Sequence, residues 1–203
     1  MSQAAGTDPT PDDPAIGELT QLLAGRTVGF IVANEGVEQV ELTAPWETIE
    51  HHGGRPVLIA VKDAPVQCTR HLDLGDQLTP IATTSDVRAE DFDAFVLPGG
   101  VVNADQLRTD SAAIRLVADM VALGRPVAAI CHAPWVLIEA DVVADRAVTS
   151  YPSLRTDLVN AGAIWRDESL VEDAPLITSR RPADLGVFCD AVLHALLGAD
   201  ESR

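Results

Sequence analysis

Residues 126–136, Pro-Val-Ala-Ala-Ile-Cys-His-Ala-Pro-Trp-Val, constrain the fold of this chain more than any other stretch. The apolar run 127–130 is short and partly β-branched, which is typical of a strand buried on both faces of a parallel sheet. A helical pattern follows at once, and Pro134 suits the first turn of that helix. Cys131 therefore stands at a sharp strand-to-helix turn, a nucleophile elbow of the kind at which enzymes carry a reactive side chain.

The position of Cys131 favours a reactive thiol over a structural one. Unpaired backbone N–H groups and the positive end of the helix dipole at such a turn both favour a thiolate. A purely structural role is the alternative, because free cysteine is among the most buried residue types. A core cysteine would be expected inside the strand, whereas Cys131 follows its carboxyl end, the edge of a parallel sheet at which ligands bind.

Strand and helix patterns alternate along the rest of the chain. Apolar runs predict strands at 27–33, 56–61, 94–97, 147–150 and 176–178, with weak strands near 164–165 and 170–171. Helical spacing predicts helices over 38–52, 105–107, 111–123, 153–160 and 182–197. Residues 34–36 are expected to break the chain after the first strand, and the irregular segment 63–84 predicts a hairpin or arm. The sequence therefore predicts an α/β fold: a single-domain, doubly wound, mostly parallel sheet of the flavodoxin-like α/β/α sandwich type.

One domain is expected to span residues 18–198. The chain has 203 residues, of which 47% are apolar, enough for one well-buried domain and too few for two α/β domains. Residues 1–17 are polar and proline-bearing, so we expect a disordered N-terminal tail there. A short C-terminal tail is expected at 199–203.

The charge balance argues against several classes of partner. The formal net charge is -17, with Lys62 as the single lysine, which disfavours nucleic-acid binding and anionic membrane surfaces. No apolar stretch approaches the length of a membrane span, and the N-terminus lacks a signal-peptide pattern, so we expect a cytoplasmic protein. Cys68, Cys131 and Cys189 lack metal-type pair spacing, so neither disulfides nor a metal site are predicted, and no cofactor is expected.

The carboxyl edge of the predicted sheet collects further candidate site residues around Cys131. Gly99 and Gly100 directly follow a predicted strand and would present backbone N–H groups at the same edge. Glu38 comes after the first strand, and His132 follows the cysteine itself. A structural role is the alternative for each: a tight turn for the glycines, a solvated helix-start carboxylate for the glutamate and a satisfied ring for the histidine.

Five segments in register resemble one known family. They are residues 33–42, 97–100, 129–134, 149–152 and 178–184. Together they make the chain similar, from about residue 27 to 197, to the PfpI branch of the ThiJ/PfpI superfamily. The resemblance implies a class I glutamine amidotransferase-like version of the flavodoxin-like fold.

The resemblance also implies roles for individual residues. It implies a reactive Cys131 beside His132, and a glutamate from the loop after the first strand that points at the sulfur. Counting along the motif assigns this glutamate to Glu38, with Glu35 as the alternative. In PfpI-type proteases a third acidic residue comes from a neighbouring subunit; Asp105 matches it as a shorter side chain in a loop of different length, and is otherwise a loop or capping acid.

Two other positions bear on the resemblance. Ala133 stands where the family often has glycine, a departure that concerns peptidase activity more than the fold. Tyr151 is a candidate pocket residue, and packing beside Pro152 is the alternative.

The expected chemistry depends on the carboxyl beside the sulfur. A Glu38 carboxylate near a thiolate would suffer like-charge repulsion and loss of hydration, so its pKa should rise and leave it protonated, donating a hydrogen bond to sulfur. Because neighbouring side chains diverge at a sharp turn, a papain-like pair of Cys131 and His132 is not assumed. We expect Cys131 to attack the aldehyde carbon of a dicarbonyl such as methylglyoxal, with backbone N–H groups near Gly100 and His132 holding the oxygen.

Three functions stand as hypotheses. The first is a cysteine-dependent stress enzyme that acts on reactive carbonyls, like glyoxalase III or a protein deglycase. The second is an intracellular cysteine peptidase of the PfpI type, which requires an oligomer to complete its site. The third is a thiol redox sensor or chaperone-like stress protein, in which Cys131 is oxidised without turnover. The expected partners are a small carbonyl or peptide substrate and further copies of this chain in a homodimer or larger homo-oligomer.

Overall fold

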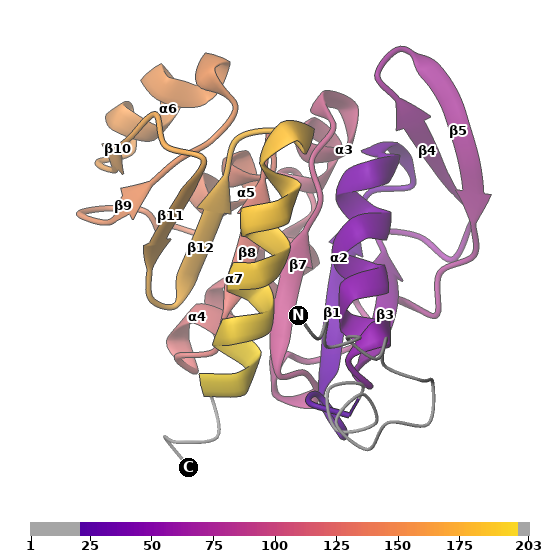
Figure 1. The fold of residues 1–203 in the computed structure, drawn as a ribbon. Helices are drawn as coiled ribbons and strands as arrows, with labels where there is room; N and C mark the ends of the chain where they lie inside the picture. The colour runs from indigo at the N-terminus through magenta and orange to yellow at the C-terminus, as the bar shows by residue number, and fades with distance from the viewer. Residues whose placement is uncertain (1–20, 199–203) are drawn as a thin grey trace, which may run out of the picture.

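A computed structural model describes residues 21–198 of the 203-residue chain (Figure 1). Its centre is a seven-stranded sheet in the order β11-β12-β8-β7-β1-β3-β6. The strands are, in chain order, β1 (Thr27–Val32), β3 (Arg55–Ala60), β6 (Ala82–Thr83), β7 (Ala94–Leu97), β8 (Val127–Ile130), β11 (Leu170–Asp173) and β12 (Leu176–Ser179). Every neighbouring pair is parallel except β11 with β12. The predicted mostly parallel α/β sheet is confirmed, whereas the tails predicted at 1–17 and 199–203 lie outside the described residues.

The central strands are buried because their sequences are apolar on both faces. Residues 28–32 of β1 and all of β8 are buried. The register places Phe30 of β1 between Leu58 of β3 and Val96 of β7. Such strands require helices on both faces of the sheet.

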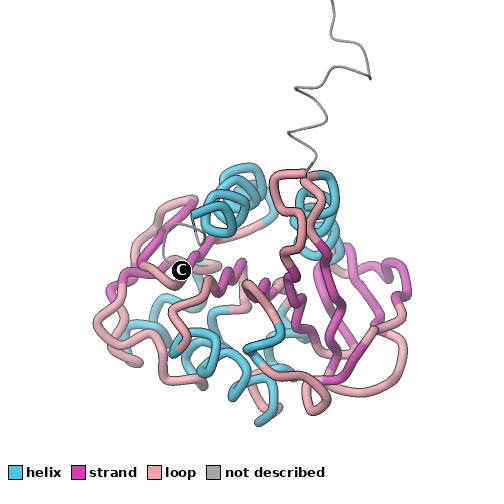
Figure 2. The backbone as a smooth tube through the Cα atoms, turned by 90° about the horizontal axis from the view of Figure 1, so that it is seen from below, coloured by secondary structure: helices cyan, strands magenta, loops and turns pink. Residues whose placement is uncertain are grey.

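Helices cover both faces, as Figures 1 and 2 show. α2 (Gln39–His51) and α7 (Leu185–Gly198) lie side by side on one face. The opposite face carries α3 (Val101–Leu107), α4 (Ser111–Ala122) and α5 (Pro134–Glu139), with α6 (Arg155–Asn160) packed against α5. One apolar core therefore lies beneath α2 and α7 and a second beneath α4 and α5. No helix within residues 21–198 is long and apolar enough to cross a membrane.

The hairpin predicted within residues 63–84 is confirmed, and a strand that was not predicted pairs with it. β4 (Val66–Arg70) and β5 (Asp73–Leu78) form an antiparallel hairpin. β2 (Glu35–Glu38) pairs in parallel with β4, although residues 34–36 were expected only to break the chain. A register shift between Glu35 and Val37, with Gly36 at φ +77°, interrupts the strand and hides its pattern in the sequence.

Two predicted elements have different limits in the structure. The run predicted as a strand at 147–150 contributes only β9 (Ala147–Val148), which pairs with β10 (Ile164–Trp165) in a separate two-stranded sheet. α3 begins at Val101, and not at residue 105, because Gly100 takes φ +96° and turns the chain directly from β7 into the helix. The described part of the chain also contains the 3-10 helices η1 (Ala89–Asp91), η2 (Pro152–Leu154) and η3 (Pro182–Asp184).

Candidate active site

Cys131 lies at the turn between β8 and α5, at the carboxyl edge of the sheet. Its φ is +64°, in the left-handed region that residues other than glycine seldom adopt. The backbone is held on both sides: the Cys131 N–H donates to the Ser179 carbonyl at 3.0 Å, and the Cys131 carbonyl accepts from the Tyr151 N–H at 2.8 Å. Only 8% of the residue is exposed. The turn therefore presents one firmly held and nearly enclosed thiol.

The His132 ring folds back onto the sulfur. Its Nδ1 atom lies 3.2 Å from Cys131 Sγ, so the expectation that the two neighbouring side chains diverge is wrong. The other ring nitrogen, Nε2, lies 3.3 Å from Ser153 Oγ, and the ring stacks on Tyr151 with centroids 4.6 Å apart. Burial lowers the pKa of His132, so the ring is neutral at neutral pH and is available to accept a proton.

The carboxyl that acts on the Cys131 thiol belongs to Glu41, and the prediction that Glu38 fills this place is wrong. Glu41 is fully buried, and its Oε2 accepts the Gly99 N–H at 2.9 Å. Its Oε1 has no nitrogen or oxygen partner within residues 21–198, and the carboxyl group hydrogen-bonds to the Cys131 thiol. One oxygen of this carboxyl is thus fixed by the backbone, and the group is directed at the sulfur.

Helix geometry explains why Glu41 and not Glu38 faces the sulfur. Glu38 is the extended residue before α2, with φ -66° and ψ 110°, and its Oε2 accepts the His71 N–H of the arm at 3.1 Å. Glu41 lies inside α2 and shares a helix face with Pro45 and Ile49, four and eight residues further on, both of which are buried. This periodicity was available in the sequence and marks Glu41 as a buried position of the helix, whereas its contact with the sulfur depends on the tertiary structure.

The other two acidic candidates lie at the surface. Glu35 is exposed, and its Oε2 accepts a hydrogen bond from Gln106 Nε2 at 3.3 Å. Asp105 is exposed on α3 and does not line the cavity above Cys131. A contribution of Asp105 to a neighbouring subunit stays a prediction.

Glu41 and Cys131 form a buried pair of acids. Burial raises the pKa of Glu41 from 4.5 to about 8. Burial raises the pKa of the Cys131 thiol, and the charge on Glu41 raises it further. The backbone N–H groups of Gly100 and His132 hydrogen-bond to the sulfur and lower this pKa in part. At neutral pH Glu41 is protonated, so the contribution of its charge is absent; burial still raises the pKa of the thiol, and the two N–H groups act against that rise.

Gly99 and Gly100 fit closely around this pair. A Cβ atom on Gly99 would lie 2.6 Å from the Cβ atom of Cys131, closer than side chains approach. The φ of +96° at Gly100 is unfavourable for any residue with a side chain. The glycines thus allow the backbone to approach the thiol closely. A tight turn alone would not require this close approach.

Asn103 of α3 fixes residues 98–100, the glycine loop between β7 and α3. Asn103 was not identified from the sequence. Its buried Nδ2 donates to the carbonyls of Pro98 at 2.9 Å and Gly99 at 3.0 Å. Its Oδ1 accepts the Ala33 N–H at 2.7 Å, which ties the loop to the end of β1. Asparagine supplies both donors and an acceptor from one short side chain.

A cavity of about 420 Å³ opens above the thiol. β2, α2, the arm, the start of α3 and the turn after β8 all contribute to it, and its lining includes Glu38, Glu41, Gly100, Cys131, His132 and Tyr151. These predicted and newly found residues therefore meet at one site.

The sequence profile of the DJ-1/PfpI family matches residues 26–195. The chain belongs to this family. Deglycase PfpI of Pyrococcus furiosus is 38% identical over 156 residues, which are 77% of this chain and 90% of that protein. Putative cysteine protease YraA of Bacillus subtilis is 35% identical over 82% of this chain and 96% of that protein. Among solved structures, DJ-1beta of Drosophila melanogaster superposes with a TM-score of 0.77 at 30% identity, over 85% of this chain and 91% of that one.

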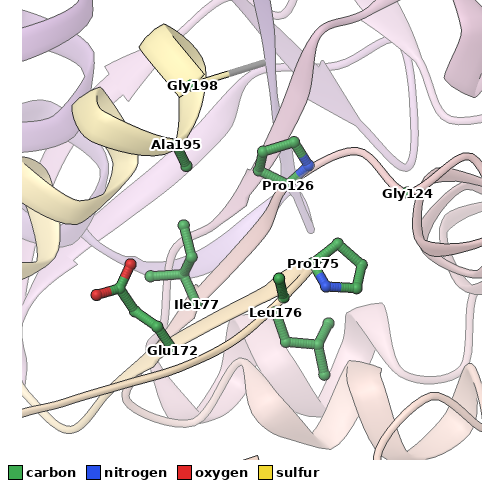
Figure 3. Close-up of a pocket in the computed structure, with 9 residues that line it drawn as sticks. Gly124, Pro126, Glu172, Pro175, Leu176, Ile177, Ala195 and Gly198 are labelled. Atoms are coloured by element: carbon green, nitrogen blue, oxygen red, sulfur yellow. The ribbon is translucent and has the colours of Figure 1, made fainter. Parts of the chain in front are cut away.

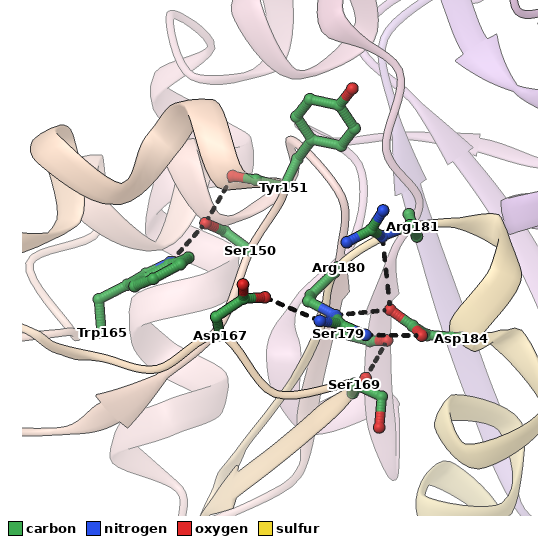
Figure 4. A network of polar contacts seen from close by, with 9 residues as sticks. All are labelled: Ser150, Tyr151, Trp165, Asp167, Ser169, Ser179, Arg180, Arg181 and Asp184. Atoms are coloured by element: carbon green, nitrogen blue, oxygen red, sulfur yellow. Dashed lines mark hydrogen bonds and ion pairs between the residues drawn. The ribbon is translucent and has the colours of Figure 1, made fainter.

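A polar network holds the segments that carry this DJ-1/PfpI site (Figure 4). Arg180 forms ion pairs with Asp184 at 2.9 Å and with Asp167 at 2.7 Å. Ser179, whose carbonyl accepts the Cys131 N–H, donates its hydroxyl to the Ser169 carbonyl at 2.7 Å. The end of β12 is therefore fixed on both sides of its contact with Cys131.

A second hollow, of about 330 Å³, lies at the opposite, amino edge of the sheet (Figure 3). Pro126, Pro175 and Ile177 line it, and Glu172 is the one titratable side chain among its described lining residues. Its described lining residues include no thiol or imidazole. Within residues 21–198, no group of three or more His, Cys, Asp or Glu side chains is placed to hold a metal ion.

Proposed function

We propose that this chain is a cysteine-dependent enzyme that converts small reactive carbonyl compounds, in the manner of glyoxalase III or a protein deglycase. One observation carries the proposal: Cys131 lines an open cavity, and its Sγ lies beside a protonated carboxyl group and 3.2 Å from an imidazole nitrogen. Glu41 is thus a proton donor and His132 a proton acceptor on either side of a nucleophile. The name deglycase carried by PfpI of Pyrococcus furiosus supports the same class.

The proposed reaction of a 2-oxoaldehyde begins at the sulfur. The Cys131 thiolate attacks the aldehyde carbon, the C–S bond forms, and the carbonyl oxygen takes the proton of Glu41 to give a hemithioacetal. The N–H groups of Gly100 and His132, which act on the sulfur, lie where the developing oxyanion forms.

The second half of the proposed reaction moves a proton between two carbons. The His132 ring removes the proton from the former aldehyde carbon and returns it to the neighbouring carbon, while the hydroxyl proton moves from the first oxygen to the oxygen of the neighbouring carbon, which leaves a thioester on Cys131. Water then hydrolyses the thioester, the C–S bond breaks, and Glu41 regains a proton. The net reaction adds one water to the dicarbonyl and yields a 2-hydroxy acid.

The test is incubation of the protein with methylglyoxal in the absence of glutathione, following loss of dicarbonyl and appearance of lactate. Lactate should form with the native chain and be absent with Cys131→Ala. Glu41→Gln removes the proton donor and should lower kcat about 100-fold or more. Equal rates for Cys131→Ala and the native chain would overturn the proposal.

A cysteine peptidase is the second candidate, because His132 Nδ1 lies within hydrogen-bond reach of the thiol, as that chemistry requires. The name of YraA, putative cysteine protease, supports it. This function would need a homo-oligomer in which Asp105 serves a neighbouring site. Cleavage of a fluorogenic casein by an oligomer, lost in both Cys131→Ala and Asp105→Ala, would favour it over carbonyl chemistry.

A thiol redox sensor is the third candidate. It would be favoured if peroxide oxidises Cys131 and the protein turns over neither methylglyoxal nor casein. We place all three functions in the cytoplasm, because Cys68, Cys131 and Cys189 are free thiols and a reducing compartment preserves them.

A further inference from the structure

We propose that this site selects carbonyl substrates that carry a positive charge, such as a protonated amine a few bonds from the carbonyl, and that Glu38 determines this specificity. The inference rests on the proposed function only in naming a carbonyl as the reacting group. The charge selection itself rests on the cavity above Cys131.

The cavity is lined by carboxyl groups without a compensating cation. Among its described lining residues the acids are Glu38 and Glu41, and no lysine or arginine is present. Glu38 is half-buried, its Oε2 accepts one backbone hydrogen bond from His71, and it forms no ion pair within residues 21–198. Its charge reaches the reaction centre, because it contributes to raising the pKa of Glu41.

The carboxyl of Glu41, which lines this cavity, adds an independent sign of a ligand. Glu41 is 0% exposed, its Oε1 is buried without a nitrogen or oxygen partner among the described residues, and the Cys131 thiol is the side chain that hydrogen-bonds to the carboxyl. When the sulfur bonds to a substrate carbon, a substrate oxygen that binds this carboxyl avoids the cost of a buried polar atom without a partner. The cavity is therefore built to receive a polar group at its base and a cation nearer its mouth.

Arginines near the cavity are already engaged elsewhere. Arg70 of the arm pairs with Asp76 at 3.3 Å. Arg180 and Arg181 both reach Asp184, at 2.9 and 4.0 Å, as the dashed lines in Figure 4 show. These pairs offset the positive charges on both sides of the site, and Glu41 is protonated at neutral pH, so the carboxylate of Glu38 dominates the local field.

The mouth of the cavity is apolar between its charged groups. Val101 and Val102 at the start of α3 are half-exposed, and Leu72 at the tip of the arm is 100% exposed. These side chains fit a short alkyl segment that joins a carbonyl at Cys131 to a cation at Glu38. A 2-oxo acid would instead bring a carboxylate towards Glu38 and be repelled.

The experiment measures alkylation of Cys131 by three reagents of matched reactivity: anionic iodoacetate, neutral iodoacetamide and cationic N-(2-aminoethyl)iodoacetamide. In each case the Sγ–C bond forms and iodide leaves, so the readout does not require carbonyl turnover. Rates are obtained by peptide mass spectrometry at Cys131 and are divided by the rates of a free thiol. Cys131→Ser shows the background from Cys68 and Cys189.

We expect the cationic reagent to outpace the anionic one by about tenfold or more, the effect of one unit charge a few ångströms away in a partly solvated site. Glu38→Gln, which keeps the shape of the side chain, should reduce this ratio about tenfold. Glu35→Gln removes an equal charge from the same strand outside the cavity, and should change the ratio less than about twofold.

Equal rates for the cationic and anionic reagents, or an unchanged ratio in Glu38→Gln, would overturn the charge selection. An equal fall of the ratio in Glu35→Gln would overturn the role of Glu38 and leave only a general effect of surface charge. If the predicted ratio appears but no carbonyl compound is turned over, the charge selection is supported and the carbonyl function alone is contradicted.

Discussion

At the scale of single residues, Glu41 links the proposed chemistry to the stability of the fold. Its carboxyl is buried, one oxygen accepts the Gly99 N–H, and burial raises its pKa to about 8. A proton held in this way is available for transfer near neutral pH. The same proton links the stability of the fold to pH.

Glu41→Gln should remove a pH dependence of unfolding. In the unfolded chain Glu41 loses its proton near pH 4.5, and in the folded chain near pH 8. Between these values the folded state binds the extra proton, so rising pH favours unfolding, by up to about 1.4 kcal/mol per pH unit from this group. Urea unfolding from pH 5 to 8 should give a flatter slope for Glu41→Gln than for the native chain.

The exposed carboxyl of Glu35 provides the control for the pH experiment. Glu35→Gln should reproduce the native slope, since that side chain is in contact with solvent. A native slope in Glu41→Gln would show that Glu41 is not the group that binds the proton.

A methyl group at Gly99 should be destabilising. Its Cβ would lie 2.6 Å from the Cβ atom of Cys131 and 2.8 Å from the Ile130 carbonyl oxygen, neither of which is the far end of a flexible side chain. Gly99→Ala should therefore lower the free energy of unfolding by about 1–3 kcal/mol. Gly186→Ala is the matched control, because a Cβ there meets nothing within 4 Å inside α7, and it should stabilise by about 0.5–1 kcal/mol. Equal urea midpoints for both variants would contradict this account.

At the scale of elements, α3 controls the glycine loop from behind. The helix begins directly after Gly100, and its third residue, Asn103, bonds to Ala33, Pro98 and Gly99. β1 and β7 are thereby joined through one side chain, at the edge where the thiol lies. Asn103 is a positioning residue, since it acts on the site through the backbone of the loop.

Asn103→Ala should leave buried polar groups without partners. Loss of these bonds should lower the free energy of unfolding by about 1–3 kcal/mol. Because the Gly100 N–H acts on the sulfur, the rate of Cys131 alkylation by iodoacetamide should change its pH profile as well as its magnitude. Gln106→Ala, an exposed substitution on the same helix, should leave the profile unaltered. A pure stability loss with a native pH profile would limit Asn103 to a structural role.

At the scale of the whole molecule, repulsion between negative charges destabilises the fold, and burial of two apolar cores stabilises it. The sequence carries 31 acidic and 14 basic residues, for a net charge of -17. Burial beneath α2 and α7 and beneath α4 and α5 holds the sheet together against this repulsion.

Added salt should therefore raise the stability of the native chain. Between 0.01 and 0.5 M NaCl the screening length falls from about 30 Å to about 4–5 Å, which weakens repulsion between surface carboxylates. Each increase of about 1 kcal/mol in the free energy of unfolding should raise Tm by about 2–4 °C for a domain of this size. A Tm that falls with NaCl would show that surface ion pairs, and not net repulsion, dominate the electrostatics.

The sequence alone determined the parallel sheet, its helices on both faces, and the place of Cys131. Strand runs such as 127–130 are apolar on both sides, and the strand-to-helix turn follows from local patterns that need no long-range information. Gly99 and Gly100 were found for the same reason, because two glycines after a strand are a local signal.

Only the tertiary structure decided which acid meets the sulfur and how the histidine is turned. Glu38 and Glu41 are three residues apart, and the choice depends on where β2 ends and α2 begins, which is set by pairing of β2 with the distant arm. The His132 ring turns towards Cys131 because Tyr151 and Ser153, about twenty residues later in the chain, hold its other side. Contacts between segments remote in sequence fix side-chain direction, and local periodicity does not contain that information.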